Sequence, residues 1–339
     1  MRLRKLAIIP LALALVCSAA RAVEPYKFLT EIPIGGEGGW DILNIDSAAR
    51  RLYLSHATKV VIVDIDANKV VGEISDTPGV HAFFPVSALR RGFSSNGKEN
   101  KCSVVDLTTL KTISKFDTDE DPDAIVYAPR HRAIYIFNHK GQTATVTDVA
   151  TLDPVTRILL GGSPEFGVAD SQAGRVYCNL EDKSEVVVID TAKPEVVTRW
   201  SLAPGQEPTG SALDSVHHRL FAACHNKMMV MLDTDTGKVV TTVPIGVGTD
   251  GCVFDDATQL AFASCGDGTT TIAKEETPEK LTVVQTLKTE RGARTIALDP
   301  NTHQVYLPTV QYAPSPGRPT IIPNTFKLLV YGPTEELEK

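Results

Sequence analysis

Short apolar strands alternate with polar turns along almost the whole chain, and the pattern recurs at a fixed period. Each copy contains a turn followed by an apolar strand with one aromatic residue; these aromatics are Tyr53, Phe93, Tyr135, Tyr177, Phe221, Phe262 and Tyr306. They follow one another at intervals of 40, 42, 42, 44, 41 and 44 residues. Strand-only repeats of this length are typical of β-propellers, in which each repeat is one blade. Seven copies predict an all-β, seven-bladed β-propeller with four-stranded blades.

Each copy has the same internal order. An inner strand such as 124–127 comes first, then the aromatic strand, then a third strand that usually ends in aspartate, and finally an outer strand. The third strands end at Asp64, Asp106, Asp148, Asp190 and Asp233, whereas the sixth copy has Lys274 at this place. The inner strands are almost continuously apolar, which predicts burial on both faces between neighbouring blades.

The two ends of the chain complement each other. The last copy runs through 327–331 without an outer strand, and the segment 26–34 resembles the outer strand at 240–245. We therefore expect the N-terminal strand to complete the last blade and close the ring, which removes an open sheet edge. Residues 23–339 would then form a single domain. A proline-rich insertion at 308–323 interrupts blade seven, on the face that carries the loops before the inner strands.

The N-terminus predicts export. Arg2, Arg4 and Lys5 precede an apolar run at 6–16, and Ala20-Arg21-Ala22 has the small-x-small form of a cleavage site. We interpret residues 1–22 as a Sec-type signal peptide cleaved after Ala22, which places the protein in the periplasm or outside the cell. Val16 is too bulky for the position before a lipidated Cys17. The chain has no apolar stretch long enough to span a membrane.

The net charge and the cysteine content limit the classes of partner and cofactor that the sequence predicts. Cleavage removes four basic residues, so the formal charge falls from −7 to −11, which disfavours nucleic acid as a partner. The mature chain keeps Cys102, Cys178, Cys224, Cys252 and Cys265. It has no CxxC motif and no CxxCH motif, so neither a zinc ribbon nor a c-type haem is expected, and no cofactor is predicted. Cys252 and Cys265 fall in one predicted hairpin and form the one pair that could be bonded.

The turn-strand copies, the Asp-ended third strands and the inner strands led by Pro122, Pro164 and Pro208 resemble the YncE-like, YVTN-repeat β-propellers of bacterial periplasms and surfaces. The resemblance covers about residues 26–332 and implies the propeller architecture. Proteins of this shape include single-stranded DNA binders and surface-layer components, and the related lactonase-type propellers hydrolyse sugar lactones. The fold alone does not select among these functions.

Polar residues gather at the starts of the inner strands, where a propeller forms a pocket around its axis. The candidate ligand-binding residues are Trp40, Asp41, His81, Asp123, Glu165, Thr209, Asp250 and Arg294. Their carboxylates, imidazole and guanidinium could perform acid–base chemistry or hold a cation. For a lactonase-like reaction the catalytic candidates are Glu165 as base, His81, and Arg294 to hold an anionic or carbonyl group. Alternatively, these residues hydrogen-bond channel water and strand ends.

The eight histidines divide between the two faces of the predicted ring. His56, His81, His139 and His225 fall on the face of the candidate pocket, and the others fall in turns of the opposite face. His56, His139 and His225 occupy nearly equivalent places in alternate blades, which predicts separations too large for a shared metal ion. The sequence therefore predicts no metal site.

The function that these features favour is that of an exported binding or scaffold protein, monomeric, with a small ligand or protein partner on the loop face around the channel. Nothing in the sequence requires an enzyme. Two alternatives remain open: a lactonase-like hydrolase with an acid–base site at the channel mouth, and a single-stranded DNA binder, which the negative charge disfavours.

Overall fold

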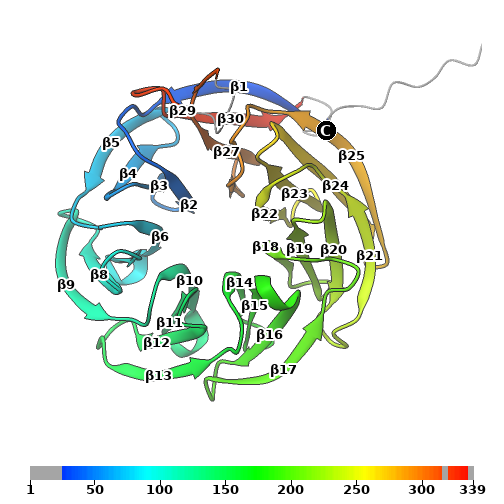
Figure 1. The fold of residues 1–339 in the computed structure, drawn as a ribbon, viewed down its shortest axis with the longest axis horizontal. Helices are drawn as coiled ribbons and strands as arrows, with labels where there is room; N and C mark the ends of the chain where they lie inside the picture. The colour runs from blue at the N-terminus through cyan, green and yellow to red at the C-terminus, as the bar shows by residue number, and fades with distance from the viewer. Residues whose placement is uncertain (1–24, 315–319, 335–339) are drawn as a thin grey trace, which may run out of the picture.

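A computed structural model describes residues 25–314 and 320–334. In this part of the chain seven four-stranded antiparallel sheets surround a central channel, and Figure 1 shows them as blades of one ring. The predicted all-β, seven-bladed propeller is confirmed. The predicted signal peptide at residues 1–22 lies outside the described residues.

The strands occupy equivalent places in each blade. The inner strands, which line the channel, are β2 Trp40–Asp46, β6 Val80–Val86, β10 Pro122–Ala128, β14 Pro164–Asp170, β18 Pro208–Asp214, β22 Thr249–Asp255 and β26 Ala297–Asp299. The second strands are β3 Arg51–His56, β7 Arg91–Asn96, β11 Ala133–Asn138, β15 Arg175–Leu180, β19 Arg219–Cys224, β23 Leu260–Cys265 and β27 Gln304–Thr309.

The third strands are β4 Lys59–Asp64, β8 Lys101–Asp106, β12 Thr143–Asp148, β16 Glu185–Asp190, β20 Met228–Asp233, β24 Thr269–Thr277 and β30 Lys327–Pro333. The outer strands are β5 Lys69–Ile74, β9 Lys111–Asp117, β13 Pro154–Leu159, β17 Glu195–Ser201, β21 Val239–Pro244, β25 Lys280–Lys288 and β1 Tyr26–Pro33. Three short 3₁₀ turns interrupt the loops, namely η1 Ser87–Leu89, η2 Pro129–His131 and η3 Glu181–Lys183. No helix in the described part is long and apolar enough to cross a membrane.

The N-terminal strand closes the ring as predicted. β1 pairs with β30 in antiparallel register, with Tyr26 opposite Pro333 and Pro33 opposite Lys327. Tyr26 is fully buried, and its ring packs edge-on against Phe262 of blade six at 5.0 Å between centroids. Its backbone N–H donates to the Gln285 side chain at 2.9 Å. Closure therefore joins blade seven to blade six as well as joining the two ends of the chain.

The insertion in blade seven forms a small hairpin where the structure describes it. β28 Tyr312–Ala313 pairs with β29 Thr320–Ile321. Tyr312 and Ile321 pack against the buried cluster that contains Trp40 and Phe326. Further backbone bonds join the return of this segment to the loop before β2, including Ile34 N–H to the Phe326 carbonyl at 2.9 Å. The insertion is therefore anchored on blade one.

The described cysteines are all free and all buried. Cys252 lies opposite Ala263 in the β22–β23 ladder, and Cys265 lies opposite Thr249. The two cysteines are consequently not cross-strand partners, and the disulfide considered from the sequence is not formed. Burial raises the pKa of the Cys252 and Cys265 thiols, which makes both poor nucleophiles.

Candidate functional site at the channel mouth

One polar position recurs in the inner strands and builds a ring around the mouth of the channel. The ring residues, one from each blade in order, are Asp41, His81, Asp123, Glu165, Thr209, Asp250 and Arg294. In the first six blades the pairing of the inner strand with the second strand shifts register across this position, for example between Pro122 and Ile125 in blade three. Such irregularities re-aim a side chain relative to a regular strand. The repeated register shift explains why the side chain at this position points toward the channel mouth in one blade after another.

His81 lies among three carboxylates. Its Nδ1 is 2.7 Å from Asp41 Oδ2 and 3.6 Å from Asp123 Oδ1, and its Nε2 is 3.8 Å from Asp121 Oδ1. Gly97 permits this arrangement, because a Cβ there would stand only 2.7 Å from His81 Nε2. The imidazole is thus held between blades one, two and three with both ring nitrogens facing acidic groups.

A second imidazole approaches Asp123 from blade three. His139 Nδ1 is 2.8 Å from Glu165 Oε1 and 3.2 Å from the Pro164 carbonyl. The donor atoms of Asp41, His81 and Asp123 all lie within 4.8 Å of one another, and so do those of Asp123, His139 and Glu165. Asp123 therefore belongs to both sets. We call these five residues the mouth cluster.

The mouth cluster is electrostatically crowded. Burial, together with the carboxylates of Asp41 and Glu165, raises the pKa of Asp123 well above its usual range. The hydrogen bond to Glu165 raises the pKa of His139 to about 9. Burial opposes the charge of His81, but the hydrogen bond to Asp41 and the nearby aspartates outweigh it and raise the pKa of His81 to about 9. At neutral pH the two imidazoles are cations that partly balance the carboxylates.

Asp250 and Arg294 form a separate pair on the other side of the mouth. Arg294 Nη1 is 2.8 Å from Asp250 Oδ2. Burial raises the pKa of Asp250 to about 7; Arg294 lowers it, while Asp41, Glu165 and Glu181 raise it further. Arg294 also lines a cavity of about 420 Å³ with Trp40 and Tyr312 beneath the insertion hairpin. The insertion thus borders the mouth.

Trp40 and Thr209, which were also predicted for the site, lie buried in the fold, as does His56, which was not among the predicted site residues. Trp40 is 9 % exposed and packs against Phe326 at 5.4 Å between ring centroids. Thr209 is buried, and its hydroxyl donates to the Thr249 carbonyl at 3.2 Å. His56 is also buried and stacks on Phe326 at 4.3 Å, with its Nδ1 3.1 Å from the Gly39 carbonyl. These three residues support the mouth from within the fold.

The three catalytic candidates do not share short contacts. Glu165 pairs with His139, His81 with Asp41, and Arg294 with Asp250. His139 was not among the predicted site residues, because the sequence suggested a shared ion only with His56 and His225, from which its place in an alternate blade separates it. The imidazoles of His81 and His139 do not need to meet, since Asp123 lies within reach of both.

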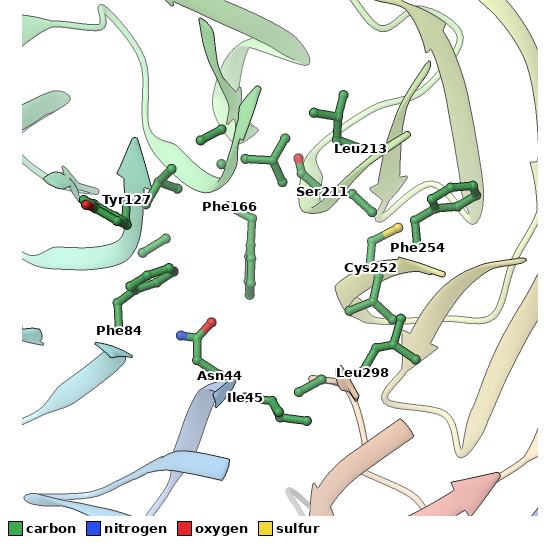
Figure 2. Close-up of a pocket in the computed structure, with 18 of the residues that line it drawn as sticks. Asn44, Ile45, Phe84, Tyr127, Phe166, Ser211, Leu213, Cys252, Phe254 and Leu298 are labelled. Atoms are coloured by element: carbon green, nitrogen blue, oxygen red, sulfur yellow. The ribbon is translucent and has the colours of Figure 1, made fainter. Parts of the chain in front are cut away.

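Below the ring the channel is mainly apolar. The cavity along it has a volume of about 700 Å³ and is lined by the inner strands of all seven blades. Figure 2 shows Phe166 projecting into the channel, with Phe84 and Tyr127 on neighbouring strands and Phe254 across the channel. Polar residues are interspersed in the lining, among them Asn44, Ser211 and Asp256, and the Asn44 amide donates to the Phe83 carbonyl at 2.8 Å. The site therefore has a charged mouth above a channel in which apolar side chains predominate.

Comparison with known proteins finds similarity in the fold alone. No family model matches the chain, and no curated protein matches it in sequence. Among solved structures, a chain of the hydrazine synthase from Kuenenia stuttgartiensis is similar at a TM-score of 0.70 and 15 % identity, covering 87 % of this chain and 96 % of that one. A chain of the mitotic checkpoint complex gives a TM-score of 0.73 at 13 % identity, covering 95 % and 98 %. At these identities the likeness shows the seven-bladed β-propeller fold alone.

Proposed function

We propose that this protein is an exported β-propeller that binds a divalent transition-metal ion at the mouth of its channel. The candidate ligands form two overlapping sets, Asp41, His81 and Asp123 in one and Asp123, His139 and Glu165 in the other. The observation that carries the proposal is Asp123, which belongs to two sets of donor atoms within 4.8 Å and has one imidazole in each. Mixed imidazole and carboxylate ligands suit ions such as Zn²⁺ and Mn²⁺ better than Ca²⁺ or Mg²⁺.

The charge balance of the mouth supports a cation. Of the ring carboxylates only Asp250 has a guanidinium partner. No hydrogen bond to the Asp123 carboxylate is found among the described residues, and its side chain is 16 % exposed. A metal ion at Asp123 would place its charge directly on the carboxylate oxygens, and it would displace the proton from each imidazole that binds it.

The cellular setting of the proposal comes from the sequence. The basic start, apolar run and cleavage site of residues 1–22 suggest export, and the repeat features resemble the YncE-like propellers. Export would place the mouth cluster in the periplasm or the extracellular medium. Fractionation of cells that express the full chain tests this, together with the N-terminal residue of the recovered protein; protein that stays in the cytoplasm and keeps Met1 would contradict it.

The two other functions fit the site less well. A lactone hydrolase would need Glu165, His81 and Arg294 to act on one carbonyl group, yet each makes its short contact with a different neighbour. Single-stranded DNA would bring phosphates to a mouth lined by Asp41, Asp123, Glu165 and Asp250, and like charges repel.

Calorimetric titration of the EDTA-treated protein with Zn²⁺ tests the proposal, with Mn²⁺ and Ca²⁺ as comparison ions. We expect the Asp123→Asn variant to lose the mouth's contribution to Zn²⁺ binding, because Asp123 serves both donor sets. The control is Asp235→Asn, which alters an exposed imidazole–carboxylate pair with His218 at 3.0 Å. Equal Zn²⁺ binding by the Asp123→Asn variant and the unchanged protein would contradict the proposal.

A further inference from the structure

A carboxylate replaces an apolar or threonine side chain at one position of the repeat. In five blades the residue that follows the end of the third strand donates its backbone N–H to the residue just before the second strand, and in blade six Glu275, within the longer β24, makes the same bond. These donors are Ile65, Leu107, Val149, Thr191, Thr234 and Glu275. The shared backbone bond shows that the positions are equivalent. Blade six alone among these has an acid here, and it is also the copy in which Lys274 replaces the usual aspartate.

Glu275 is buried without a hydrogen-bonding partner for its carboxylate. The residue is 3 % exposed, and within the described part of the chain neither Oε1 nor Oε2 has a hydrogen-bond partner. Buried polar groups are almost always paired, because an unpaired one costs the free energy of its lost hydration. A carboxylate buried in this way, with the His217 imidazole no closer than 3.9 Å and a second carboxyl group in Asp214 beside it, leaves room for a further positive partner.

The neighbouring groups are metal-ligand types. Asp214, at the end of the inner strand of blade five, has a fully buried side chain whose Oδ2 is 2.6 Å from His217 Nδ1. Glu275 Oε1 is 3.9 Å from the same nitrogen, and the donor atoms of the three residues all lie within 4.8 Å of one another. Asp214 Oδ1 accepts backbone N–H groups from Val216 and His217, so Oδ2, the oxygen that faces His217 Nδ1, is the one that could ligate an ion together with the imidazole.

The nearest guanidinium is committed to other groups. Arg219 Nη1 is 2.7 Å from Asp233 Oδ2, and its Nε donates to the Pro278 carbonyl at 2.5 Å. Arg219 fastens the β24–β25 hairpin of blade six to blade five but forms no ion pair with Glu275 among the described residues. Arg219 is therefore not the positive partner of Asp214 and Glu275.

The interface between blades three and four has the same histidine position but no carboxylate at the positions of Asp214 and Glu275. His131 corresponds to His217, and its Nδ1 is 2.9 Å from the Thr191 hydroxyl, at the position of Glu275. Ala128 stands where blade five has Asp214, since both end the inner strand opposite the first residue of the second strand. That interface is neutral and hydrogen-bonded. The interface of blades five and six keeps the histidine and adds two buried carboxylates.

We propose that Asp214, His217 and Glu275 form a second divalent metal site, between blades five and six and on the face opposite the mouth. One imidazole and two carboxylates are ligands for Zn²⁺ or Mn²⁺, and three protein ligands leave further positions for water. The ion would join two blades that Arg219 also links at this edge. This site does not depend on the mouth cluster.

The test uses the full chain carrying Asp123→Asn, which removes the binding expected at the mouth, after EDTA treatment. We expect Zn²⁺ to bind this protein and to raise its thermal midpoint. Adding Glu275→Gln or His217→Asn should weaken the remaining Zn²⁺ binding by about tenfold or more, because each removes a ligand. The matched control is His131→Asn at the interface of blades three and four, which should leave Zn²⁺ binding unchanged.

The competing explanation is a proton shared by Asp214 and Glu275. Glutamine is an isostere of the protonated acid, so under this explanation Glu275→Gln would fold normally while Zn²⁺ would neither bind the Asp123→Asn protein nor shift its midpoint. That result would overturn the proposed second site. Zn²⁺ binding that survives both Glu275→Gln and His217→Asn would also overturn it.

Discussion

The mouth cluster and the cluster of Asp214, His217 and Glu275 contain the same chemical groups in different surroundings. At the mouth, neighbouring inner strands contribute partly exposed side chains, and the two imidazoles balance the carboxylates, with a pKa of about 9 for His139. Between blades five and six, two buried carboxylates share one imidazole. Burial, followed by the charge of Asp214, raises the pKa of Glu275 to about 7. The pKa is thus raised for histidine and for a carboxyl group in both clusters: His81, His139 and Asp123 at the mouth, and His217 and Glu275 between blades five and six.

Removing the strand that closes the ring should disrupt both clusters at once, and we expect it to have the largest effect on stability. Deletion of residues 25–34 removes β1, the partner of β30, together with the buried Tyr26. We expect loss of cooperative thermal unfolding or a destabilisation of at least about 4–5 kcal/mol, because an edge of blade seven and its contact with blade six are lost. Circular dichroism during heating measures this. An unchanged midpoint would contradict closure by β1.

The mouth should bind metal more tightly as the pH rises. Its imidazoles must lose their protons to coordinate an ion, and the pKa of each is about 9. Between pH 6 and 9 we expect Zn²⁺ affinity to increase by up to about tenfold per pH unit for each imidazole used. Calorimetry in buffers of different ionisation heats will also detect the released protons. An affinity independent of pH would show that His81 and His139 are not ligands.

The buried cluster should make the metal-free protein less stable as the pH rises. The pKa of Glu275 is about 7 in the folded protein against an ordinary 4.5. The folded state then holds a proton that the unfolded state has lost, so stability falls as the pH rises from 4.5 through 7. At pH 8 the free energy of unfolding is lower by about 1–3 kcal/mol than it is at acidic pH. The range allows for the nearby charges of Asp214, His217 and Arg219.

Glu275→Gln removes this titration. In EDTA the variant should match the unchanged protein near pH 5 and be more stable than it at pH 8. Urea unfolding at the two pH values measures the difference. A variant that follows the same pH dependence as the unchanged protein would show that Glu275 is not the group responsible.

The smallest expected effect concerns His139 without metal. Its pKa is raised from 6.5 to about 9, so the stabilisation by its pair with Glu165 is fully present below pH 6.5 and is lost as the pH rises through 9. Because the pair is partly exposed, His139→Gln should cost about 1 kcal/mol at pH 6 and little at pH 10. Urea unfolding is again suitable. An equal cost at both pH values would indicate lost packing rather than lost charge.

The sequence predicted the architecture because the repeat is visible as spacing. The aromatic strands, the Asp-ended third strands and the resemblance of 26–34 to an outer strand are local patterns, and the ring follows from their number and order. The recurring mouth position was also predicted, since the start of each inner strand has the same place relative to the axis. Trp40 and Thr209 were included with it, but the packing that buries them is not visible in their neighbours along the chain.

The pairings within each cluster could not be predicted in the same way. His139 reaches Glu165 across a blade boundary, and this depends on loop conformation and side-chain rotamers. The cluster of blades five and six was overlooked although it left a signal: Lys274 interrupts the run of third-strand aspartates, and the acid that follows it occupies a position where other blades have Ile65, Val149 or Thr191. Alignment of the repeats by their backbone bonds, rather than by residue type, brings this out.

Anomalous diffraction from crystals grown with Zn²⁺ would locate the ion itself, with data collected on both sides of the zinc absorption edge. We expect an anomalous peak at the mouth, within coordination distance of an Asp123 carboxylate oxygen and of a nitrogen of His81 or His139. We also expect this peak to be absent from crystals of the Asp123→Asn variant. A map with no peak beside Asp123, from crystals in which Zn²⁺ is bound elsewhere, would contradict the proposed site at the mouth.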